Sequence, residues 1–363
     1  MALPQVLDDL HHHLAVDLVV VTDLLHQLKV DEWSDEAQRF VHLRRDRLQH
    51  QNVVPQFDPM QGSTKMPAKL ELLEVEVSEG VRTITIHHKH PACIMTLDLS
   101  RELATAIDDA ETDDATRVIV FRSADADFFI AHFDVSEIVK WVDPDFSSGD
   151  HPFNDARLQA VREGASRQQV RPGSAEKLRT SSKVSIAEIA GRAGGGGNEF
   201  CSGCDMRFGL AGKTKLNQME VPLGILPGGN GTVNLPKLMG RGRALEVILG
   251  GVDIDAETAE RWGYLNRVFP SKESLSAHVD ALARRIASFP TVAVANAKQS
   301  VLNSLAMSQE EALNHEYLLF AETLKDPASK KLMTAFLEER GGQTREGELK
   351  VGELAPYLPF SSL

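Results

Sequence analysis

The 363-residue chain is poor in cysteine and has no long apolar run. Its three cysteines, Cys93, Cys201 and Cys204, do not provide a disulfide framework, which favours a reducing compartment. No apolar run approaches the ~20 residues of a membrane span. The first thirty residues contain acids and no arginine, unlike a transit peptide, and lack the basic n-region of a secretory signal. We therefore expect a cytoplasmic protein that does not enter a membrane.

The sequence also lacks an excess of positive charge and several familiar motifs. A formal net charge of -13 argues against a nucleic-acid partner. Gly212-Lys-Thr214 resembles the end of a P-loop, but Arg207 stands where its first glycine is needed. Glu199 replaces the last glycine of a dinucleotide-binding G-x-G-x-x-G, and no serine lies in G-x-S-x-G. Cys201 and Cys204 have no second pair, so we interpret them as core residues and expect no metal site.

What the chain does have is a stretch saturated with glycine. Gly191 and Gly194–Gly197 follow the apolar run Val184–Ala190, which predicts a buried strand, and precede a segment of helical character. Each glycine costs about 1 kcal/mol relative to alanine in regular structure, so we expect the backbone to approach something closely or to point bare N–H groups into a site. The alternative, a flexible linker, fits poorly with apolar flanks. A strand, a glycine turn and a helix N-terminus together stabilise negative charge.

Two carboxylates lie close to this stretch in the sequence. Glu199 falls in the first turn after Gly197. Glu220 precedes a second glycine-containing stretch, Val221–Gly231, in which Pro227–Thr232 predicts a second glycine turn. Taken alone, Glu199 could be a surface residue that complements a helix dipole, and Glu220 a solvated loop residue. Together, two carboxylates beside one oxyanion site suit general acid and base catalysis on a thioester or ketone.

The surrounding pattern predicts a mixed α/β domain. Leu73–Val77 and Val81–Thr85 alternate around a Ser78–Gly80 turn, which indicates a β-hairpin. A helical stripe over 99–110, capped by Asp98 or Ser100, then leads to the apolar strand Val118–Phe121, so we expect a βαβ unit and a partly parallel sheet. Further expected elements are strands at Met206–Phe208 and Val268, and helices at Arg243–Leu249, Asp255–Gly263 and from Lys272 onward.

We divide the chain into three parts. Residues 1–66 form a partly helical N-terminal extension, in which His11, His12 and His13 do not share a helix face and are not expected to bind metal. Residues 67–270 form the core, and residues 271–363 form a C-terminal helical region and tail. Residues 143–182 are a Pro-, Gly-, Ser- and Arg-bearing insertion in the core, which predicts an irregular lid, binding loop or disordered segment.

Several motifs occur in an order that is typical of one family. They are Ile189–Glu199, Cys204–Phe208, Gln218–Glu220, Leu223–Thr232, Gly240–Ala244 and Ile254–Gly263. With these motifs, the chain from about Leu70 to Leu337 resembles the enoyl-CoA hydratase/isomerase (crotonase) family, most strongly over Ser185–Pro270.

The resemblance implies an α/β crotonase-like ββα-repeat spiral with a C-terminal helical trimerisation region. It implies acyl-CoA thioester substrates, no cofactor beyond the coenzyme A of the substrate, and a homotrimer or hexamer. It also implies that the backbone N–H groups of Phe133 and Gly196 form an oxyanion hole, and that Glu199 and Glu220 are catalytic. The remaining implied substrate-binding residues are Ala131, His132, Asp134, Gly195, Pro227 and Gly228.

The retained glutamate pair favours an acyl-CoA hydratase or dehydratase that adds water across an enoyl-CoA double bond. Alternatives are another reaction through the same enolate, namely isomerisation, decarboxylation or thioester hydrolysis, or a non-catalytic CoA-binding scaffold. His132 replaces the glycine of the family's Ala-Gly-x-Asp loop, so we expect that loop to avoid a glycine-only conformation. Arg157, Arg162 and Arg167 in the insertion either bind CoA phosphates or belong to a solvated lid.

Overall fold

The computed structural model describes residues 70–142, 155–164, 173–338 and 342–354. The chain divides into two compact units, Met1–Pro67 and Ala68–Leu363, and every described residue belongs to the second. The predicted N-terminal extension, with His11–His13, lies outside the described residues. Over the described ranges, no helix is long and apolar enough to cross a membrane.

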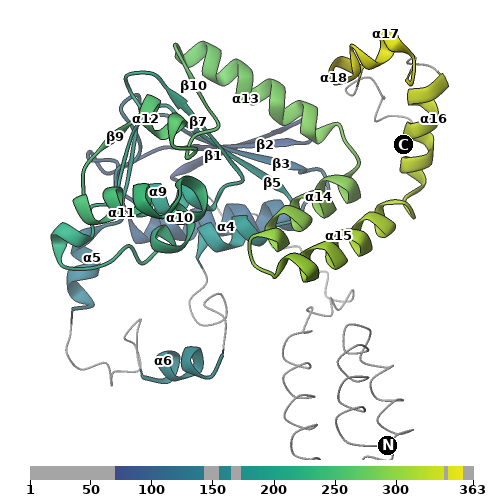
Figure 1. The fold of residues 1–363 in the computed structure, drawn as a ribbon. Helices are drawn as coiled ribbons and strands as arrows, with labels where there is room; N and C mark the ends of the chain where they lie inside the picture. Colours follow the sequence, from purple (N-terminus) through teal and green to yellow (C-terminus); the bar gives the residue numbers. More distant parts are fainter. Residues whose placement is uncertain (1–69, 143–154, 165–172, 339–341, 355–363) are drawn as a thin grey trace, which may run out of the picture. The chain divides into compact units, whose positions relative to one another are not determined.

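Two sheets form the framework of the second unit (Figure 1). The larger has six strands in the order β1-β2-β3-β5-β7-β10, and the smaller has four in the order β4-β6-β8-β9. The strands are β1 (Leu73–Ser78), β2 (Val81–Ile86), β3 (Val118–Ser123), β4 (Phe128–Ile130), β5 (Val184–Ile189), β6 (Arg192–Gly194), β7 (Met206–Leu210), β8 (Lys215–Asn217), β9 (Ile254–Asp255) and β10 (Arg267–Phe269). Only the β1–β2 hairpin and the β8–β9 pair are antiparallel.

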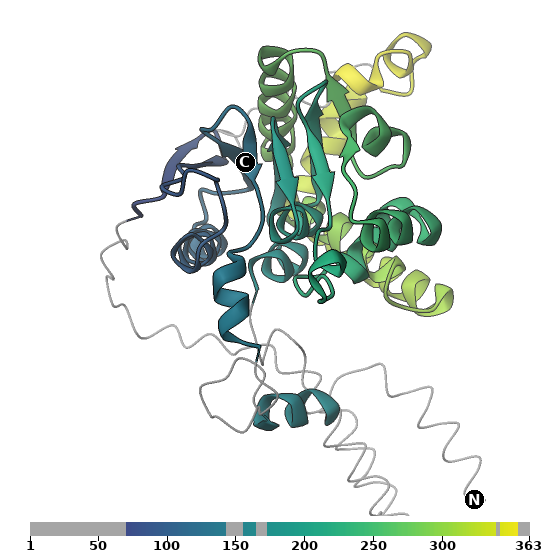
Figure 2. The ribbon, with the colours of Figure 1, turned by 90° about the vertical axis from the view of Figure 1, so that its left-hand side faces the viewer.

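Helices follow the strands and make up the C-terminal part (Figures 1 and 2). They are α4 (Leu97–Thr112), α5 (Val135–Lys140), α6 (Asp155–Arg162), α8 (Ser174–Thr180), α9 (Gly196–Gly203), the short 3-10 helix η2 (Val221–Leu223), α10 (Gly231–Met239), α11 (Arg241–Gly250), α12 (Ala256–Arg261), α13 (Lys272–Ala287), α14 (Thr291–Ser304), α15 (Gln309–Thr323), α16 (Pro327–Glu338), α17 (Arg345–Glu348) and α18 (Val351–Leu354).

From β3 to β8, successive strands alternate between the two sheets. β3, β5 and β7 join the larger sheet, and the strand that follows each of them, β4, β6 or β8, joins the smaller one. A helix then follows each pair: α5 after β4, α9 after β6, and η2 with α10 after β8. This arrangement confirms the predicted ββα-repeat fold and the parallel βαβ unit around α4.

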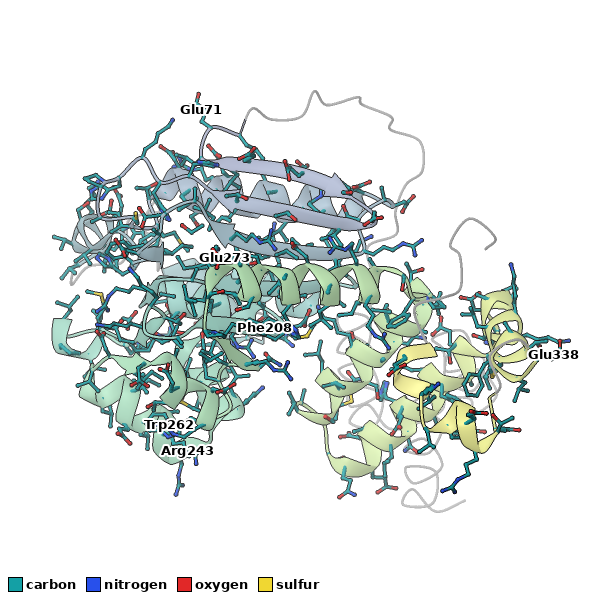
Figure 3. All side chains as sticks on the ribbon, turned by 90° about the horizontal axis from the view of Figure 1, so that it is seen from above. Glu71, Phe208, Arg243, Trp262, Glu273 and Glu338 are labelled. Atoms are coloured by element: carbon teal, nitrogen blue, oxygen red, sulfur yellow. The ribbon has the colours of Figure 1, made fainter. Side chains whose placement is uncertain are left out.

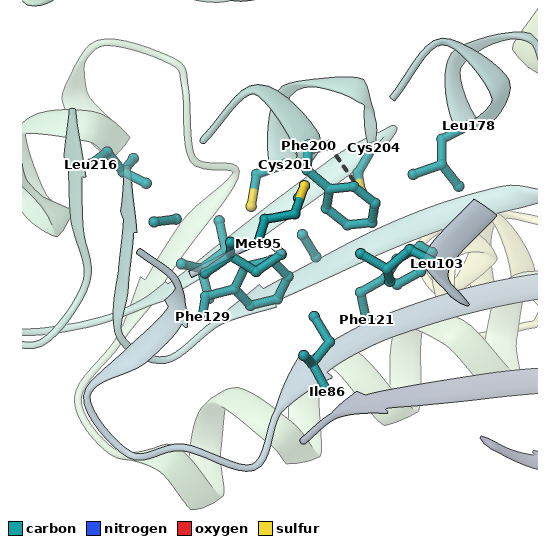
Figure 4. Close-up of a cluster of buried hydrophobic side chains, with 14 of the residues drawn as sticks. Ile86, Met95, Leu103, Phe121, Phe129, Leu178, Phe200, Cys201, Cys204 and Leu216 are labelled. Atoms are coloured by element: carbon teal, nitrogen blue, oxygen red, sulfur yellow. Dashed lines mark hydrogen bonds between the residues drawn. The ribbon is translucent and has the colours of Figure 1, made fainter. Parts of the chain in front are cut away.

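The larger sheet is covered on both faces, which explains why β3 is apolar at every central position. Ile119 and Phe121 point to the face that α4 covers, where Phe121 meets Phe200 edge-to-face at 5.0 Å between ring centroids (Figure 4). Val118 and Val120 point to the face that α13 covers. On that face Phe208, which is labelled in Figure 3, packs near α13. Its ring lies 5.0 Å from that of His278 of α13, measured between centroids.

Cys201 and Cys204 lie in the same core, as predicted. Both thiols are buried, and the Cys204 Sγ donates to the carbonyl of Phe200 one turn back in α9 (Figure 4). Burial raises the pKa of the Cys204 thiol to about 12, so this thiol stays protonated at neutral pH. The cysteines therefore act as small core residues.

Several sequence predictions were wrong in detail. The α4 N-cap is Thr96, whose side chain accepts from Leu99 N, rather than Asp98 or Ser100. The second glycine stretch is not only a turn, because α10 begins inside it at Gly231 and runs through Pro236. The strands of the smaller sheet were too short, at two or three residues each, to show a period in the sequence.

The segment 143–182 is not irregular throughout. α6 and α8 are helical, and the buried Ala175 and Leu178 dock α8 on the main body of the fold. The side chain of Leu178 belongs to the core cluster of Figure 4. Arg162 is exposed at the end of α6, whereas the side chains of Arg157 and Arg167 lie outside the described residues. CoA binding by these arginines stays a prediction.

Candidate active site

The glycine stretch divides into three conformations. Its first part is β6, its middle is a turn at Gly195, and its last part opens α9 at Gly196. Gly195 has φ 46° and ψ -124°, a conformation that residues with a Cβ rarely adopt. The predicted turn between a buried strand and a helix N-terminus is therefore present, with one additional short strand before it.

The glycines let this stretch pass very close to residues 127–131. A Cβ atom on Gly191 would overlap the backbone of Asp127, and one on Gly197 would overlap the Ile130 carbonyl oxygen. A Cβ on Gly194 would lie 2.7 Å from the Ala131 carbonyl oxygen. The close backbone approach that the sequence predicted is thus made to β4 and to the residues on either side of it.

That loop, Ala131–Asp134, is fixed by backbone hydrogen bonds to Cys93 and Met95. Ala131 N donates to Cys93 O at 2.9 Å, Met95 N to His132 O at 2.7 Å, and Asp134 N to Met95 O at 3.0 Å. His132 keeps a negative φ, as expected for a loop whose usual glycine is replaced. Asp134 is the N-cap of α5. Its carboxylate accepts from Ser136 N and so holds the first turn of that helix.

The loop and the glycine turn bring two backbone donors together. A Cβ on Gly196 would lie 3.2 Å from Phe133 N and 2.8 Å from Phe133 Cβ. Within the part of the chain that the structure describes, neither the Phe133 N–H nor the Gly196 N–H donates to a protein acceptor. Gly196 also opens a helix, so the partial positive charge of the α9 N-terminus lies at the same place. Two unused donors at such a position favour a negatively charged oxygen.

Glu199 is buried one turn into α9, with 5% of its surface exposed. Its Oε1 accepts from Gly229 N at 2.6 Å and from Gly231 N at 2.9 Å. The alternative in which Glu199 is a surface residue is therefore wrong. The two N–H groups orient the carboxylate and stabilise negative charge on it.

Glu220 is likewise buried, with 8% of its surface exposed, which excludes the solvated-loop alternative. Burial raises the pKa of its carboxyl to about 7, and the nearby charge of Glu199 adds to the rise. A carboxyl with such a pKa carries a proton in a large fraction of molecules at neutral pH. Glu220 can therefore serve as an acid where an ordinary glutamate could not.

The structure brings most of the predicted residues to one place. A Cβ on Gly195 would lie 2.8 Å from Glu220 Oε1 and 3.4 Å from His132 Cβ, so the turn, the loop and the second glutamate meet there. Pro227 lies beside Gly231, 2.9 Å from a Cβ placed on that glycine. At Gly228 a Cβ would meet only the Leu226 carbonyl oxygen, at 3.9 Å. Over the described ranges, no group of three His, Cys, Asp or Glu side chains is placed to hold a metal.

The residues that hold Glu199 were not predicted from the sequence. Gly229 and Gly231 supply the two N–H donors, and neither leaves room for a side chain, since a Cβ on Gly229 would lie 2.5 Å from Glu199 Oε2. The signal in the sequence that could have indicated them was their place in the second glycine stretch. Trp141 was also missed; it packs on Phe133 with 5.7 Å between ring centroids.

Comparisons with known proteins agree with this fold and site. The family profile described as enoyl-CoA hydratase/isomerase matches residues 76–346. A probable enoyl-CoA hydratase of Rhizobium meliloti is 31% identical over 271 residues, which is 74% of this chain and 96% of that protein. The short-chain-enoyl-CoA hydratase of Clostridium acetobutylicum is 28% identical over 266 residues, which is 73% of this chain and 94% of that protein.

Solved structures show the same likeness. An enoyl-CoA hydratase of Geobacillus kaustophilus superposes with a TM-score of 0.64 at 29% identity, over 75% of this chain and 96% of that one. DspI of Pseudomonas aeruginosa superposes with a TM-score of 0.63 at 29% identity, over 78% of this chain and all of that one. The family match spans both sheets except the start of β1, and it includes every residue of the candidate site. The chain therefore belongs to the enoyl-CoA hydratase/isomerase family of enzymes.

Proposed function

We propose that the protein adds water across the double bond of an enoyl-CoA thioester, or removes it in the reverse direction. The observation that carries this proposal is the pair of buried carboxylates, Glu199 and Glu220, beside two unused backbone donors. The names of the relatives support the substrate class. The reaction needs a base, an acid and a place for negative charge, and the site has a candidate for each.

In this mechanism the thioester oxygen lies between the N–H groups of Phe133 and Gly196. When water attacks Cβ, the electrons of the double bond move to that oxygen and form an enolate. Preorganised N–H groups stabilise such an oxyanion by roughly 3–4 kcal/mol each. Backbone N–H groups provide this stabilisation, so it does not depend on the side chain of residue 133.

Glu199 acts as the base and Glu220 as the acid. Glu199 takes a proton from the attacking water, and Glu220 gives its proton to Cα as the enolate collapses. The net change is one water added, and transfer of a proton from Glu199 to Glu220 restores the pair. The two assignments follow from the surroundings: N–H donors stabilise the Glu199 carboxylate, and burial favours the protonated form of Glu220.

The test is loss of the enoyl-thioester absorbance of crotonyl-CoA and of longer enoyl-CoAs. Glu199→Gln and Glu220→Gln should each lower kcat by about 10²–10⁴-fold, because each removes proton transfer, while CoA affinity stays close to wild type. Activity that survives both substitutions would show that the glutamates are not the acid and base.

The same site is suited to an isomerase, a decarboxylase or a thioester hydrolase, since each passes through an enolate or oxyanion. Analysis of the products separates these reactions. A hydratase yields the 3-hydroxyacyl thioester, an isomerase a shifted double bond, and a hydrolase free CoA. Detection of free CoA as the first product would exclude hydration.

We also infer that the enzyme works as a homotrimer or hexamer. Support comes from α15, whose apolar side chains at Leu313, Tyr317, Leu318 and Phe320 are between 56% and 74% exposed on the single chain. Apolar exposure of this extent on one helix is typical of an interface.

A further inference from the structure

Gln218 is a fully buried polar residue beside the glycine turn, and it has no role in the mechanism above. It follows β8 directly. β8 runs parallel to β6, with Asn217 opposite Gly194, and Gly195 N donates to Asn217 O at 3.1 Å. Gln218 therefore lies next to Gly195, where the chain leaves the sheet and enters α9.

The hydrogen-bond network assigns the orientation of the Gln218 amide. With its nitrogen toward the turn, the amide donates to Gly195 O at 3.3 Å and to Asn217 O at 3.2 Å. The reverse orientation would place the amide oxygen against the same two carbonyl oxygens, with no hydrogen between them. A buried polar group left without a partner costs about 1–3 kcal/mol, so the donating orientation prevails.

The Gly195 carbonyl matters because of what lies at the other end of its peptide unit. Gly195 C=O and Gly196 N–H belong to one rigid plane and point in opposite directions. The carbonyl also accepts from Glu199 N at 2.9 Å, so two donors hold the same oxygen. Hydrogen bonds to a carbonyl orient the N–H of the same peptide and strengthen it as a donor.

We propose that Gln218 is a positioning residue that holds the Gly195–Gly196 peptide so that the Gly196 N–H points at the thioester oxygen. This inference rests on the proposed function, in which Gly196 is an oxyanion donor. Gln218 does not touch the substrate and acts only through the peptide. Removing its amide should weaken polarisation of the bound thioester without changing how CoA is held.

A purely structural role is the competing explanation, and the chain offers a matched control. Asn234 is a second buried amide that binds α9, donating to Ser202 Oγ at 3.1 Å near the other end of the helix. Its hydrogen bonds do not involve the Gly195–Gly196 peptide. Asn234, on α10, makes a comparable buried amide contact to α9, so Asn234→Leu should lower stability and leave the oxyanion donor in place.

The experiment compares wild type, Gln218→Met and Asn234→Leu with a conjugated dienoyl-CoA as the probe. Polarisation of the thioester carbonyl shifts the absorbance of the bound dienoyl group to longer wavelength. For Gln218→Met we expect at least half of this shift to be lost. We also expect kcat to fall about 10- to 100-fold, with KM and the pH at half-maximal activity little changed. Asn234→Leu should keep the full shift.

The outcomes separate this inference from the proposed function. A wild-type shift that Gln218→Met retains would overturn the positioning role alone. No shift in the wild-type protein would overturn the oxyanion hole, and the positioning role with it. Gln218→Leu is the second variant if circular dichroism shows that Gln218→Met does not fold. Its apolar side chain likewise cannot donate to Gly195 O, so the same loss of shift is expected.

Discussion

Glu199 and Glu220 have the same side chain, and their surroundings make them different. Both are buried, but Glu199 receives two backbone N–H groups, whereas Glu220 is placed where burial and the charge of Glu199 oppose its ionisation. Acid–base catalysis uses two carboxyls whose surroundings differ in this way. The sequence showed the two residues and their spacing. Their difference arises from the hydrogen bonds that Glu199 accepts from Gly229 and Gly231 and from the burial of Glu220.

The raised pKa of Glu220 predicts a pH-dependent cost in stability. In the unfolded chain this carboxyl titrates near 4.5, and in the folded protein near 7. The folded state binds more protons between these values, so the free energy of unfolding falls as pH rises from about 4.5 through 7. The loss amounts to at most about 3 kcal/mol above pH 7.

Glu220→Gln should remove this pH dependence. Urea unfolding at pH 5 and pH 8 measures it, and the variant should gain stability relative to wild type at pH 8 more than at pH 5. The same difference at both pH values would mean that the Glu220 carboxyl titrates normally in the folded protein.

A second residue-scale prediction concerns the support of Glu199. In Gly229→Ala the new methyl would lie 2.5 Å from Glu199 Oε2, so the carboxylate must move. We expect kcat to fall about 10- to 100-fold, because a displacement near 1 Å at a catalytic group has that order of effect. Steady-state kinetics with crotonyl-CoA measures the change.

Gly242→Ala in α11 is the control, since a Cβ there meets nothing within 4 Å. It should keep full activity and, as an alanine in a helix, raise stability by up to about 1 kcal/mol. Equal kinetics for the two variants would contradict the role assigned to the Gly229 contact.

At the scale of elements, the site is made where short strands end. β4 leads into the Ala131–Asp134 loop, β6 leads into the Gly195 turn, and β8 leads into Gln218 and Glu220. These three strands are neighbours in the smaller sheet and run parallel, so their carboxyl ends lie on one edge. Parallel pairing thus gathers residues that are as far apart in sequence as Phe133 and Glu220.

The start of α4 provides a test at this scale. Thr96→Ala should destabilise the protein by about 1 kcal/mol, because it removes the side-chain acceptor for Leu99 N, at 3.2 Å. Ser100→Ala, at the cap position that the sequence suggested, should change stability by no more than about 0.5 kcal/mol. Thermal denaturation measures the stability of the two variants. A larger loss of stability for Ser100→Ala than for Thr96→Ala would place the cap at Ser100.

At the scale of the whole molecule, the C-terminal helices differ from one another in how much apolar surface they bury. α13 buries Leu275, Val279 and Ala283 against the larger sheet. α15 has no buried residue and exposes apolar side chains at Leu313, Tyr317, Leu318 and Phe320. A helix of this kind needs a partner surface, which for this chain we propose to be another copy of itself.

The oligomer is tested by sedimentation. Wild type should sediment at about 120 kDa for three chains of 39.9 kDa, or at twice that mass as a hexamer. Tyr317→Glu combined with Leu318→Glu should give mainly monomer, because burying two carboxylates in an interface is strongly unfavourable. Gln159→Glu on the exposed face of α6 is the control and should leave the mass unchanged. A monomeric wild type would contradict the inference.

The sequence by itself determined the class of fold and predicted the residues of the candidate site. Alternation over 73–85 predicted the hairpin, the stripe over 99–110 predicted α4, and the glycines predicted a turn before a helix. These signals are local, so each can be detected in a few residues of sequence. The motif order from Ile189 to Gly263 was sufficient to indicate the family.

The tertiary structure alone decided that the Glu220 carboxyl is buried with a raised pKa, which glycines hold Glu199, and which backbone the glycines approach. It also decided that α8 joins the core and that α10 begins within a predicted turn. These features depend on burial and on contacts between segments far apart in the chain. A carboxyl's proton affinity and a backbone N–H group's direction are set by such contacts, and no pattern of neighbouring residues contains them.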